Sequence, residues 1–156
     1  MLRKALLIST NNRIDRDGEI VSTRALADYV QASHNEQGEY IGNSKMLMWH
    51  AGEAIGRVLD CDLMNGFLIE VCEELPDAMV NIGTSEEPIT ASIKAVWDAI
   101  ASEQDNLGVS QGFLYDPATQ DGEGVFHHIL KYESSILPID RASNPYTFVR
   151  VFNSEA

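Results

Sequence analysis

The stretch Gly108–Leu114, Gly-Val-Ser-Gln-Gly-Phe-Leu, predicts a β-strand that carries a serine at its centre. Serine and glycine are depleted in strands because their side chains add little to a packed face. Gly112 therefore indicates a position where another backbone or a peptide substrate comes very close. The simplest interpretation of Ser110 is a buried hydroxyl bonded to a backbone carbonyl, because a bare Ser-x-Gly pattern is common. A catalytic interpretation requires a base nearby.

The length and composition predict one folded domain over residues 1–156. The chain is long enough to bury a core, and 44% of its residues are hydrophobic and 22% charged. Its 24 acidic residues outnumber its 11 basic residues, which gives a net charge of −13. That charge repels phosphate backbones, so we expect no nucleic-acid partner.

The apolar runs predict a cytoplasmic protein. None approaches the roughly 20 residues that cross a bilayer, so we expect no membrane partner. Residues 1–8 are basic and then apolar, but the apolar part is shorter than a secretory signal requires. The two cysteines, Cys61 and Cys72, are too few for a disulfide framework, and we expect reduced, partly buried thiols.

Hydrophobic periodicity predicts a mainly β protein with two helices. A first helix is expected after a cap at Ser22 or Thr23 and ends near Ala32. The βαβ alternation of a parallel sheet is missing, so we predict an α+β fold with about seven strands in a β-barrel or sandwich decorated by helices. The expected strands are residues 5–10, 46–50, 55–60, 67–73, 108–114, 125–131 and 132–137, which are either two strands or one bent strand, and 146–152.

The second helix is expected from about Thr90 to Ser102. Its apolar residues recur at helical spacing, which indicates a face that packs on the core. The residues of this face are Ile89, Ile93, Val96, Trp97 and Ile100.

The dipeptide Asn65-Gly66 predicts a β-hairpin with a two-residue turn. This turn fixes the register of the two strands that it joins, and the opposed residues can contact each other. The expected opposed pairs are Cys61 with Glu70, Leu59 with Cys72, and Arg57 with Glu74.

The residues Asp15–Glu19 contain an Asp-x-Asp-Gly turn that mimics half a calcium loop. The full loop needs an acidic residue at its first position and a glutamate at its twelfth, and here these positions are Arg13 and Arg24. The histidines and cysteines also lack the short paired spacing of zinc ligands. We therefore expect no metal and no cofactor.

Four histidines are available as the base that a serine nucleophile requires. His34 lies in a polar loop, and His127 and His128 are adjacent on a predicted strand, where their side chains face opposite ways. His50 ends the apolar run 46–50, and the small residues that follow are expected to break the strand. This predicts an imidazole at the rim of the barrel, where it titrates near neutral pH. A core histidine bonded to a carbonyl is the simpler alternative.

Glu133 stands near the start of an otherwise apolar strand. An exposed glutamate at a sheet edge is the simpler interpretation. The catalytic interpretation is a carboxylate that orients His50 and stabilises the imidazolium formed during catalysis.

Three motifs occur in order: His-x-x-x-x-Ile-Gly-Arg-Val at His50–Val58, Val-Ser-x-Gly-Phe at Val109–Phe113, and Glu-Ser-Ser-Ile-Leu-Pro followed by Ala-Ser-Asn-Pro within Glu133–Pro145. Together they resemble the prohead (capsid maturation) proteases of HK97-like tailed bacteriophages. The opening, from Asp15 into the first helix, is also similar to the start of that family, so the resemblance covers nearly the whole chain.

The resemblance implies a serine endopeptidase whose fold is related to herpesvirus assemblin, a largely antiparallel β-barrel surrounded by helices. By position in the motifs, Ser110 matches the nucleophile, His50 the general base and Glu133 the third member.

Two further roles follow from the same resemblance. The herpesvirus relatives use a second histidine as the third member, so His127 and His128 remain alternatives to Glu133. In those relatives an arginine-bearing loop supplies the oxyanion hole, and Arg141 is the candidate here.

The resemblance also implies the partners and the location. The expected substrates are the scaffold or delta domain, the capsid precursor and the protease itself, inside the procapsid in the host cytoplasm. The expected self-cleavage end is Ala156, and a homo-oligomer is expected.

Two other functions are left open by the residues. One is a non-catalytic capsid-assembly component with the same fold. The other is an unrelated cytoplasmic serine hydrolase that acts on small esters.

Overall fold

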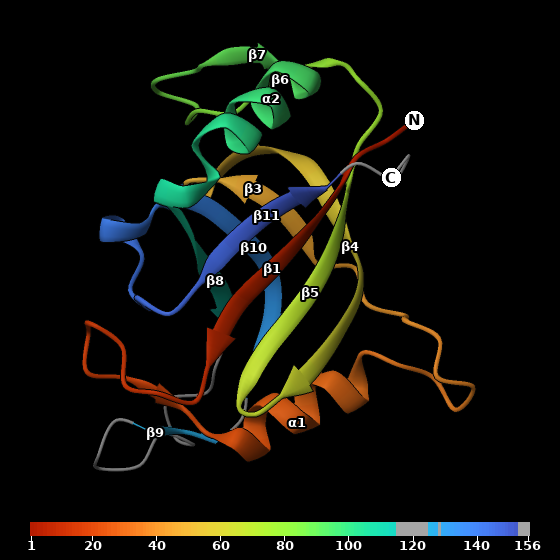
Figure 1. Ribbon diagram of the computed structural model, residues 1–156, viewed down its shortest axis with the longest axis vertical. Coiled ribbons are helices and arrows are strands. Elements are labelled where there is room, and N and C mark those ends of the chain that lie inside the picture. The colour runs from red at the N-terminus through yellow and green to blue at the C-terminus, as the bar shows by residue number, and fades with distance from the viewer. Residues whose placement is uncertain (115–124, 128, 153–156) are drawn as a thin grey trace.

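The computed structural model describes residues 1–114, 125–127 and 129–152 (Figure 1). A seven-stranded sheet with the order β11-β1-β5-β4-β3-β10-β8 curls into a half-barrel. Neighbouring strands are antiparallel except for β3 and β10, which are parallel. The strands of this sheet are β1 (Lys4–Asn11), β3 (Lys45–Met48), β4 (Ala51–Met64), β5 (Phe67–Glu74), β8 (Leu107–Leu114), β10 (Leu130–Pro138) and β11 (Phe148–Phe152).

The prediction of a mainly β, α+β fold with about seven strands is confirmed. Two details differ from the predicted antiparallel barrel: one strand pair is parallel, and the sheet is a half-barrel in which β8 and β11 are the end strands. The predicted strand 125–131 also differs, because the described residues of this range are extended only in β9 (Val125–Phe126) and at the start of β10.

The remaining elements lie at the two ends of the half-barrel. The helix α1 (Thr23–Ala32) lies at one end and α2 (Ile93–Glu103) at the other (Figure 1). No helix in the described ranges is long and apolar enough to cross a membrane. The short elements are β2 (Ile20–Val21), which pairs with β9, β6 (Met79–Asn81), which pairs with β7 (Thr90–Ser92), and the 3-10 turns η1 (Gln104–Asn106) and η3 (Ile139–Arg141).

The caps set where both helices begin. Ser22 caps α1 as predicted, since its Oγ accepts a hydrogen bond from the Ala25 N–H at 3.1 Å. The cap of α2 is Ser92, whose Oγ accepts from the Ala95 N–H at 3.0 Å. The helix therefore begins three residues later than predicted, because Thr90–Ser92 forms strand β7.

The apolar face of α2 packs on the core largely as predicted. Ile89 is the exception, because it precedes β7 and is exposed. Trp97 is fully buried, and its indole N–H donates to the Ile55 carbonyl at 2.9 Å, which satisfies its polar group. The other buried residues of this face are Ile93, Val96 and Ile100.

A β-bulge changes the predicted register of the β4–β5 hairpin. The turn Asn65-Gly66 forms as predicted, with both residues at positive φ, and Cys61 lies opposite Glu70. Beyond the bulge at Leu59, however, the register shifts by one residue. Cys72 therefore pairs with Val58 and Arg57 with Glu73, so the predicted pairs with Leu59 and Glu74 are wrong.

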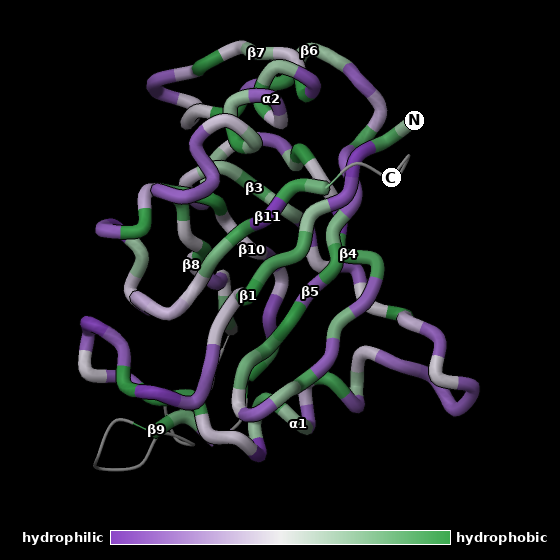
Figure 2. The backbone as a smooth tube through the Cα atoms, in the orientation of Figure 1, coloured by the Kyte–Doolittle hydropathy of each residue, from purple (hydrophilic) through white to green (hydrophobic). Residues whose placement is uncertain are grey.

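The core has two apolar clusters with a polar layer between them. One cluster gathers around α2 and contains Trp97 and Cys72; the other packs against α1 and contains Leu26 and Leu68. On β5, the fully buried Glu70 stands between Leu68 and Cys72 on the same face of the strand. Cys61 and Cys72 are both free and buried. Figure 2 shows the apolar strands in the middle of the molecule and hydrophilic loops around it.

The polar layer is built on an ion pair that water does not reach. Lys131 Nζ lies 2.9 Å from Glu70 Oε2, and both side chains are fully buried. Lys131 Nζ also donates to Ser44 Oγ at 2.7 Å, and Ser134 Oγ donates to Glu70 Oε1 at 2.6 Å. A buried charge is tolerated when it is paired and hydrogen-bonded in this way.

A second bulge, at Tyr132, decides which way the side chains of β10 face. Lys131 pairs with Phe113 and Glu133 with Gly112, so Tyr132 is the extra residue. Without it, Lys131 and Glu133 would share a face. With it, Lys131 faces the core and Glu133 faces the opposite side of the sheet.

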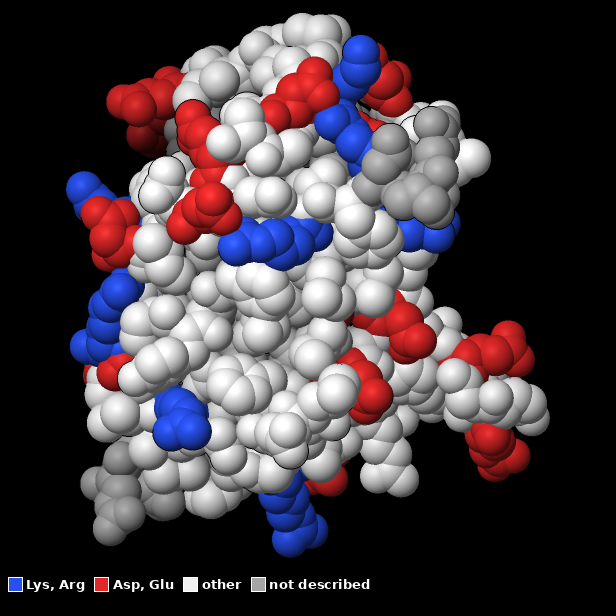
Figure 3. Space-filling model, in the orientation of Figure 1, with Lys and Arg blue, Asp and Glu red and all other residues white. Residues whose placement is uncertain are grey.

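Acidic side chains predominate on the surface in Figure 3, in agreement with the net charge of −13. They gather at the end of the molecule that carries α2 and on the projecting loop of residues 33–44 (Figure 3).

Lys131→Met is expected to lower the free energy of unfolding by about 3–5 kcal/mol, because it leaves the Glu70 carboxylate buried without its partner. The matched control is Arg57→Met, which breaks the exposed pair with Glu73 (3.1 Å) and is expected to cost at most about 1 kcal/mol. Urea unfolding followed by circular dichroism measures both. Equal losses in the two variants would contradict the assigned role of the buried pair.

Candidate active site

His50 lies in a tight turn and not at the end of a strand. Strand β3 ends at Met48 and β4 begins at Ala51, so Trp49 and His50 are the two turn residues. Their φ angles are 53° and 57°, as two-residue hairpin turns require. The prediction that residues 51–54 break the strand is wrong, because β4 begins there. Positive φ costs roughly 1–2 kcal/mol per non-glycine residue, and such strain clusters at functional sites.

Strand β10 holds this strained turn in place. The Trp49 N–H donates to the Ile136 carbonyl at 3.2 Å. The His50 N–H donates to Ser135 Oγ at 2.8 Å. The turn therefore keeps its conformation through backbone donors that are satisfied by the neighbouring strand.

Strand β8 brings Ser110 to the same place. Ser110 pairs in register with Ser135 on β10, and its Oγ lies 2.8 Å from His50 Nε2 although the two residues are 60 positions apart. The structure thus brings together the predicted nucleophile and the predicted base at hydrogen-bond distance.

Glu133 completes the arrangement and fixes the histidine tautomer. His50 Nδ1 donates a hydrogen bond to Glu133 Oε1. The neutral ring therefore has its lone pair on Nε2, and this nitrogen accepts a hydrogen bond from the Ser110 hydroxyl. The second carboxylate oxygen, Oε2, accepts a hydrogen bond from Ser135 Oγ at 2.7 Å. Glu133 is 3% exposed, whereas the His50 side chain is 42% exposed. The simpler interpretation of Glu133 as an exposed edge residue is therefore wrong.

Gly112 is required by this carboxylate. A Cβ at position 112 would lie 2.7 Å from Glu133 Cγ, closer than side chains tolerate. The predicted close approach at Gly112 is thus found, but what approaches is the glutamate side chain of the paired strand.

The hydrogen bond and the charge of Glu133 raise the pKa of His50 above its ordinary value. Partial burial of the imidazole acts in the opposite direction but is the weaker influence. Glu133 therefore favours the imidazolium, the form that appears when a histidine accepts a proton from serine.

A cleft of about 340 Å³ opens beside these residues and is lined by Ser110, His50 and Glu133. Its volume lies within the range of small-molecule and peptide side-chain sites. Its walls combine apolar and acidic groups, among them Val21, Leu47, Phe113, Asp15, Asp17 and Glu19. Asp15 also builds the predicted turn, since its Oδ1 accepts the Asp17 and Glu19 N–H groups at 2.9 Å.

The other predicted residues lie elsewhere. Arg141 ends η3, is exposed and is not among the residues that line the cleft. His127 lies at an exposed bend and not on a strand, and it does not line the cleft. His34 pairs with Asp60 at 2.6 Å, outside the cleft. His128 and Ala156 lie outside the described residues.

The sequence prediction assigned no role to Ser135, which binds Glu133, or to Asn144, which lines the cleft. Ser135 could have been found, because residues two apart on a strand share a face and it follows Glu133 at that spacing. Asn144 could not, because its position depends on contacts with distant strands. Among the described residues, no group of three or more His, Cys, Asp or Glu side chains is placed to hold a metal ion.

No protein-family model, no curated protein and no solved structure matches this chain.

Glu133→Gln is expected to lower the pKa of His50, because the amide keeps the size of the side chain but removes the charge that favours the imidazolium. A titration of the His50 ring signals by NMR measures the shift, and His34 serves as the internal control. In the wild type, His50 protonation stabilises the fold fully below the unfolded pKa of about 6.5, and this contribution is lost as the pH rises through the folded pKa. An unchanged His50 pKa in the variant would contradict the assigned contact.

Proposed function

We propose that this protein is a serine endopeptidase of the prohead-protease type, with Ser110 as nucleophile, His50 as general base and Glu133 as the orienting acid. The observation that carries the proposal is the 2.8 Å contact between Ser110 Oγ and His50 Nε2, with His50 Nδ1 bonded to a buried carboxylate. Nucleophile, base and orienting group within hydrogen-bond reach are the signature of activated serine.

The chemistry proceeds by acyl transfer. Ser110 Oγ bonds to the scissile carbonyl carbon while His50 Nε2 takes the hydroxyl proton. The imidazolium then gives this proton to the leaving amine as the carbon–nitrogen bond breaks. A water molecule, deprotonated by the same histidine, attacks the acyl-enzyme and releases the carboxylic acid. Glu133 stays ionised throughout and stabilises the imidazolium.

The resemblance supplies the substrate class and the setting. The substrates are the scaffold or delta domain, the capsid precursor and the protease itself. Cleavage takes place inside the procapsid in the host cytoplasm, by a homo-oligomer whose subunits have an assemblin-like fold. The curled seven-stranded sheet with a helix at each end supports the architecture that this proposal requires.

One alternative enzyme has an observation in its favour. A cleft of about 340 Å³ is at the small end for a binding site, which suits a hydrolase that acts on small esters. A non-catalytic capsid-assembly component is the other alternative, and the assembled site argues against it.

Ser110→Ala is expected to abolish labelling of the protein by a fluorophosphonate probe, because it removes the hydroxyl that contacts His50 Nε2. The matched control is Ser143→Ala, whose hydroxyl lines the same cleft but donates to Asp17; this variant is expected to label like the wild type. Mass spectrometry measures the labelled fraction of each variant.

The substrate class is tested by co-expression with candidate head proteins. Cleavage of capsid precursor that stops in Ser110→Ala supports the peptidase. Ester turnover without any proteolysis would favour the small-ester hydrolase, and an unlabelled wild type would favour the non-catalytic component.

Ser135→Ala is expected to slow labelling of Ser110 by about tenfold to a hundredfold, because it removes the hydroxyl that holds both Glu133 and the His50 backbone. Lost buried hydrogen bonds cost about 1–3 kcal/mol, which corresponds to this range. Ser135→Thr keeps a hydroxyl and is expected to recover most of the rate. The control Ser134→Ala changes the adjacent hydroxyl, which faces Glu70 in the core, and is expected to lower stability with little effect on labelling. Similar labelling rates in the two alanine variants would reject the role of Ser135.

A further inference from the structure

Asn144 is a buried amide whose orientation is fixed by its neighbours. The Tyr146 N–H donates to Asn144 Oδ1 at 3.0 Å, and only an oxygen accepts such a bond. Asn11 Nδ2 donates to the same Oδ1 at 3.2 Å. Asn11 is oriented in turn, because its Oδ1 accepts the Arg13 N–H at 2.9 Å. Two backbone donors therefore determine which end of Asn144 is the amino group.

The amino group of Asn144 is left without a partner among the described residues. Asn144 is 9% exposed and lines the cleft beside Ser110. Within the described residues, the fully enclosed side-chain atoms that lack a partner are Tyr40 Oη and Gln111 Oε1. Asn144 Nδ2 is not one of these enclosed atoms, so it is an oriented donor, on a residue that lines the cleft, that the described protein atoms do not satisfy.

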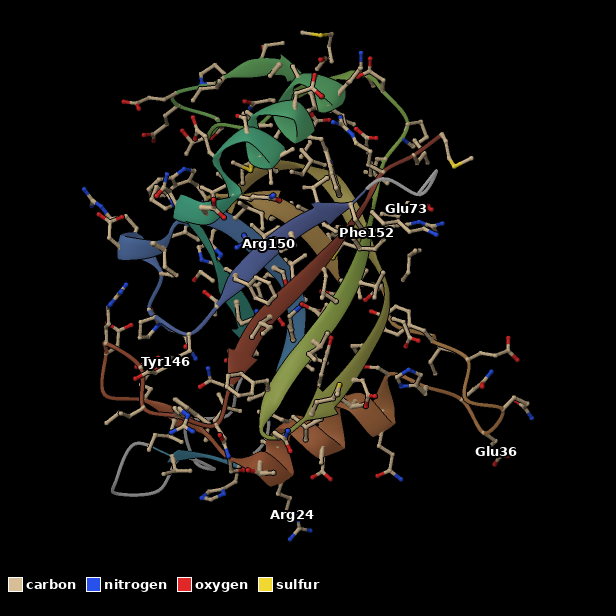
Figure 4. All side chains as sticks on the ribbon, in the orientation of Figure 1. Arg24, Glu36, Glu73, Tyr146, Arg150 and Phe152 are labelled. Carbon is tan, nitrogen blue, oxygen red and sulfur yellow. The ribbon has the colours of Figure 1, made fainter. Side chains whose placement is uncertain are left out.

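Thr147 ties the Asn144 loop to the strand of the nucleophile. Its Oγ1 accepts the Val109 N–H at 2.9 Å and donates to the Asn144 carbonyl at 3.2 Å. Val109 directly precedes Ser110, so two hydrogen bonds link Asn144 to the backbone beside the nucleophile. Tyr146, labelled in Figure 4, marks this loop where it leads into β11.

We propose that Asn144 Nδ2 donates a hydrogen bond to the carbonyl oxygen of the acyl group that Ser110 attacks. This inference rests on the proposed function and assigns a donor to its oxyanion. As Ser110 Oγ bonds to the carbonyl carbon, the π pair moves onto the oxygen and the hydroxyl proton moves to His50 Nε2. Asn144 transfers no proton; it stabilises the charge on that oxygen until the carbonyl re-forms and the leaving group departs.

This assignment replaces Arg141 as the side-chain candidate. Arg141 is exposed and lies away from the cleft lining, whereas Asn144 is buried, oriented and already in the cleft. A preorganised donor of this kind is effective because it needs no rearrangement when charge develops.

The test compares the hydrolysis of p-nitrophenyl acetate by the wild type and by Asn144→Asp. The aspartate keeps an oxygen that accepts the Tyr146 N–H but replaces the donor by an acceptor. We expect kcat to fall by about a hundredfold to a thousandfold, the range for loss of one such donor, with KM within about twofold, because the interaction forms as charge develops in the transition state. The charge control is Asn12→Asp, whose amide donates to Thr23 outside the cleft and which is expected to leave kcat unchanged.

A higher KM with unchanged kcat, or no change in either constant, would overturn the assignment. If Asn144→Asp does not fold, as judged by circular dichroism, Asn144→Ser provides the same comparison with a shorter side chain. A wild type that is inert and also unlabelled by a fluorophosphonate would instead reject the proposed function. An active wild type with an equally active Asn144→Asp variant would reject only the role of Asn144.

Discussion

The site depends on one constraint: strand β10 must present charged side chains to both of its faces. Lys131 points into the core, where it pairs with Glu70, and Glu133 points to the opposite side, where it accepts a hydrogen bond from His50 Nδ1. The bulge at Tyr132 makes this possible by inserting one residue between them. A regular strand would put both side chains on one face and leave Glu70 or His50 without its partner. A bulge beside an active site is a recurrent way to re-aim a side chain.

The strained turn at Trp49 and His50 is a second consequence of the same strand. Two bulky residues at positive φ are unfavourable in isolation, and β10 stabilises them through the Ile136 carbonyl and the Ser135 hydroxyl. Ser135 therefore holds both the Glu133 carboxylate and the His50 backbone through one hydroxyl. The geometry around His50 is the product of tertiary contacts and not of local preference.

This explains which features the sequence could predict. The Asn65-Gly66 turn and the Ser22 cap have local signatures and are found as predicted. The Trp49-His50 turn has none, because its residues are atypical of hairpin turns, so His50 was placed at a strand end. The bulges were missed for a related reason: an extra residue is visible only against the partner strand. Ser110, His50 and Glu133 were identified because their motifs resemble a family, whereas spacing alone left each with a simpler interpretation.

The location of the cleft follows from the incomplete closure of the sheet. Strands β8 and β1 lie side by side without a ladder, and side chains bridge them: Gln111 Nε2 donates to the Ser9 carbonyl. The cleft lies along the gap between β1 and β8. Ser110 is on β8, whose other edge pairs with β10. Ser110 thus sits on a hydrogen-bonded strand at the border of the cleft. The site requires that Ser110 be accessible and that the Asn144 loop lie beside the cleft. A closed barrel would cover Ser110, and a flat sheet would keep the Asn144 loop away from the cleft. The half-barrel meets both requirements.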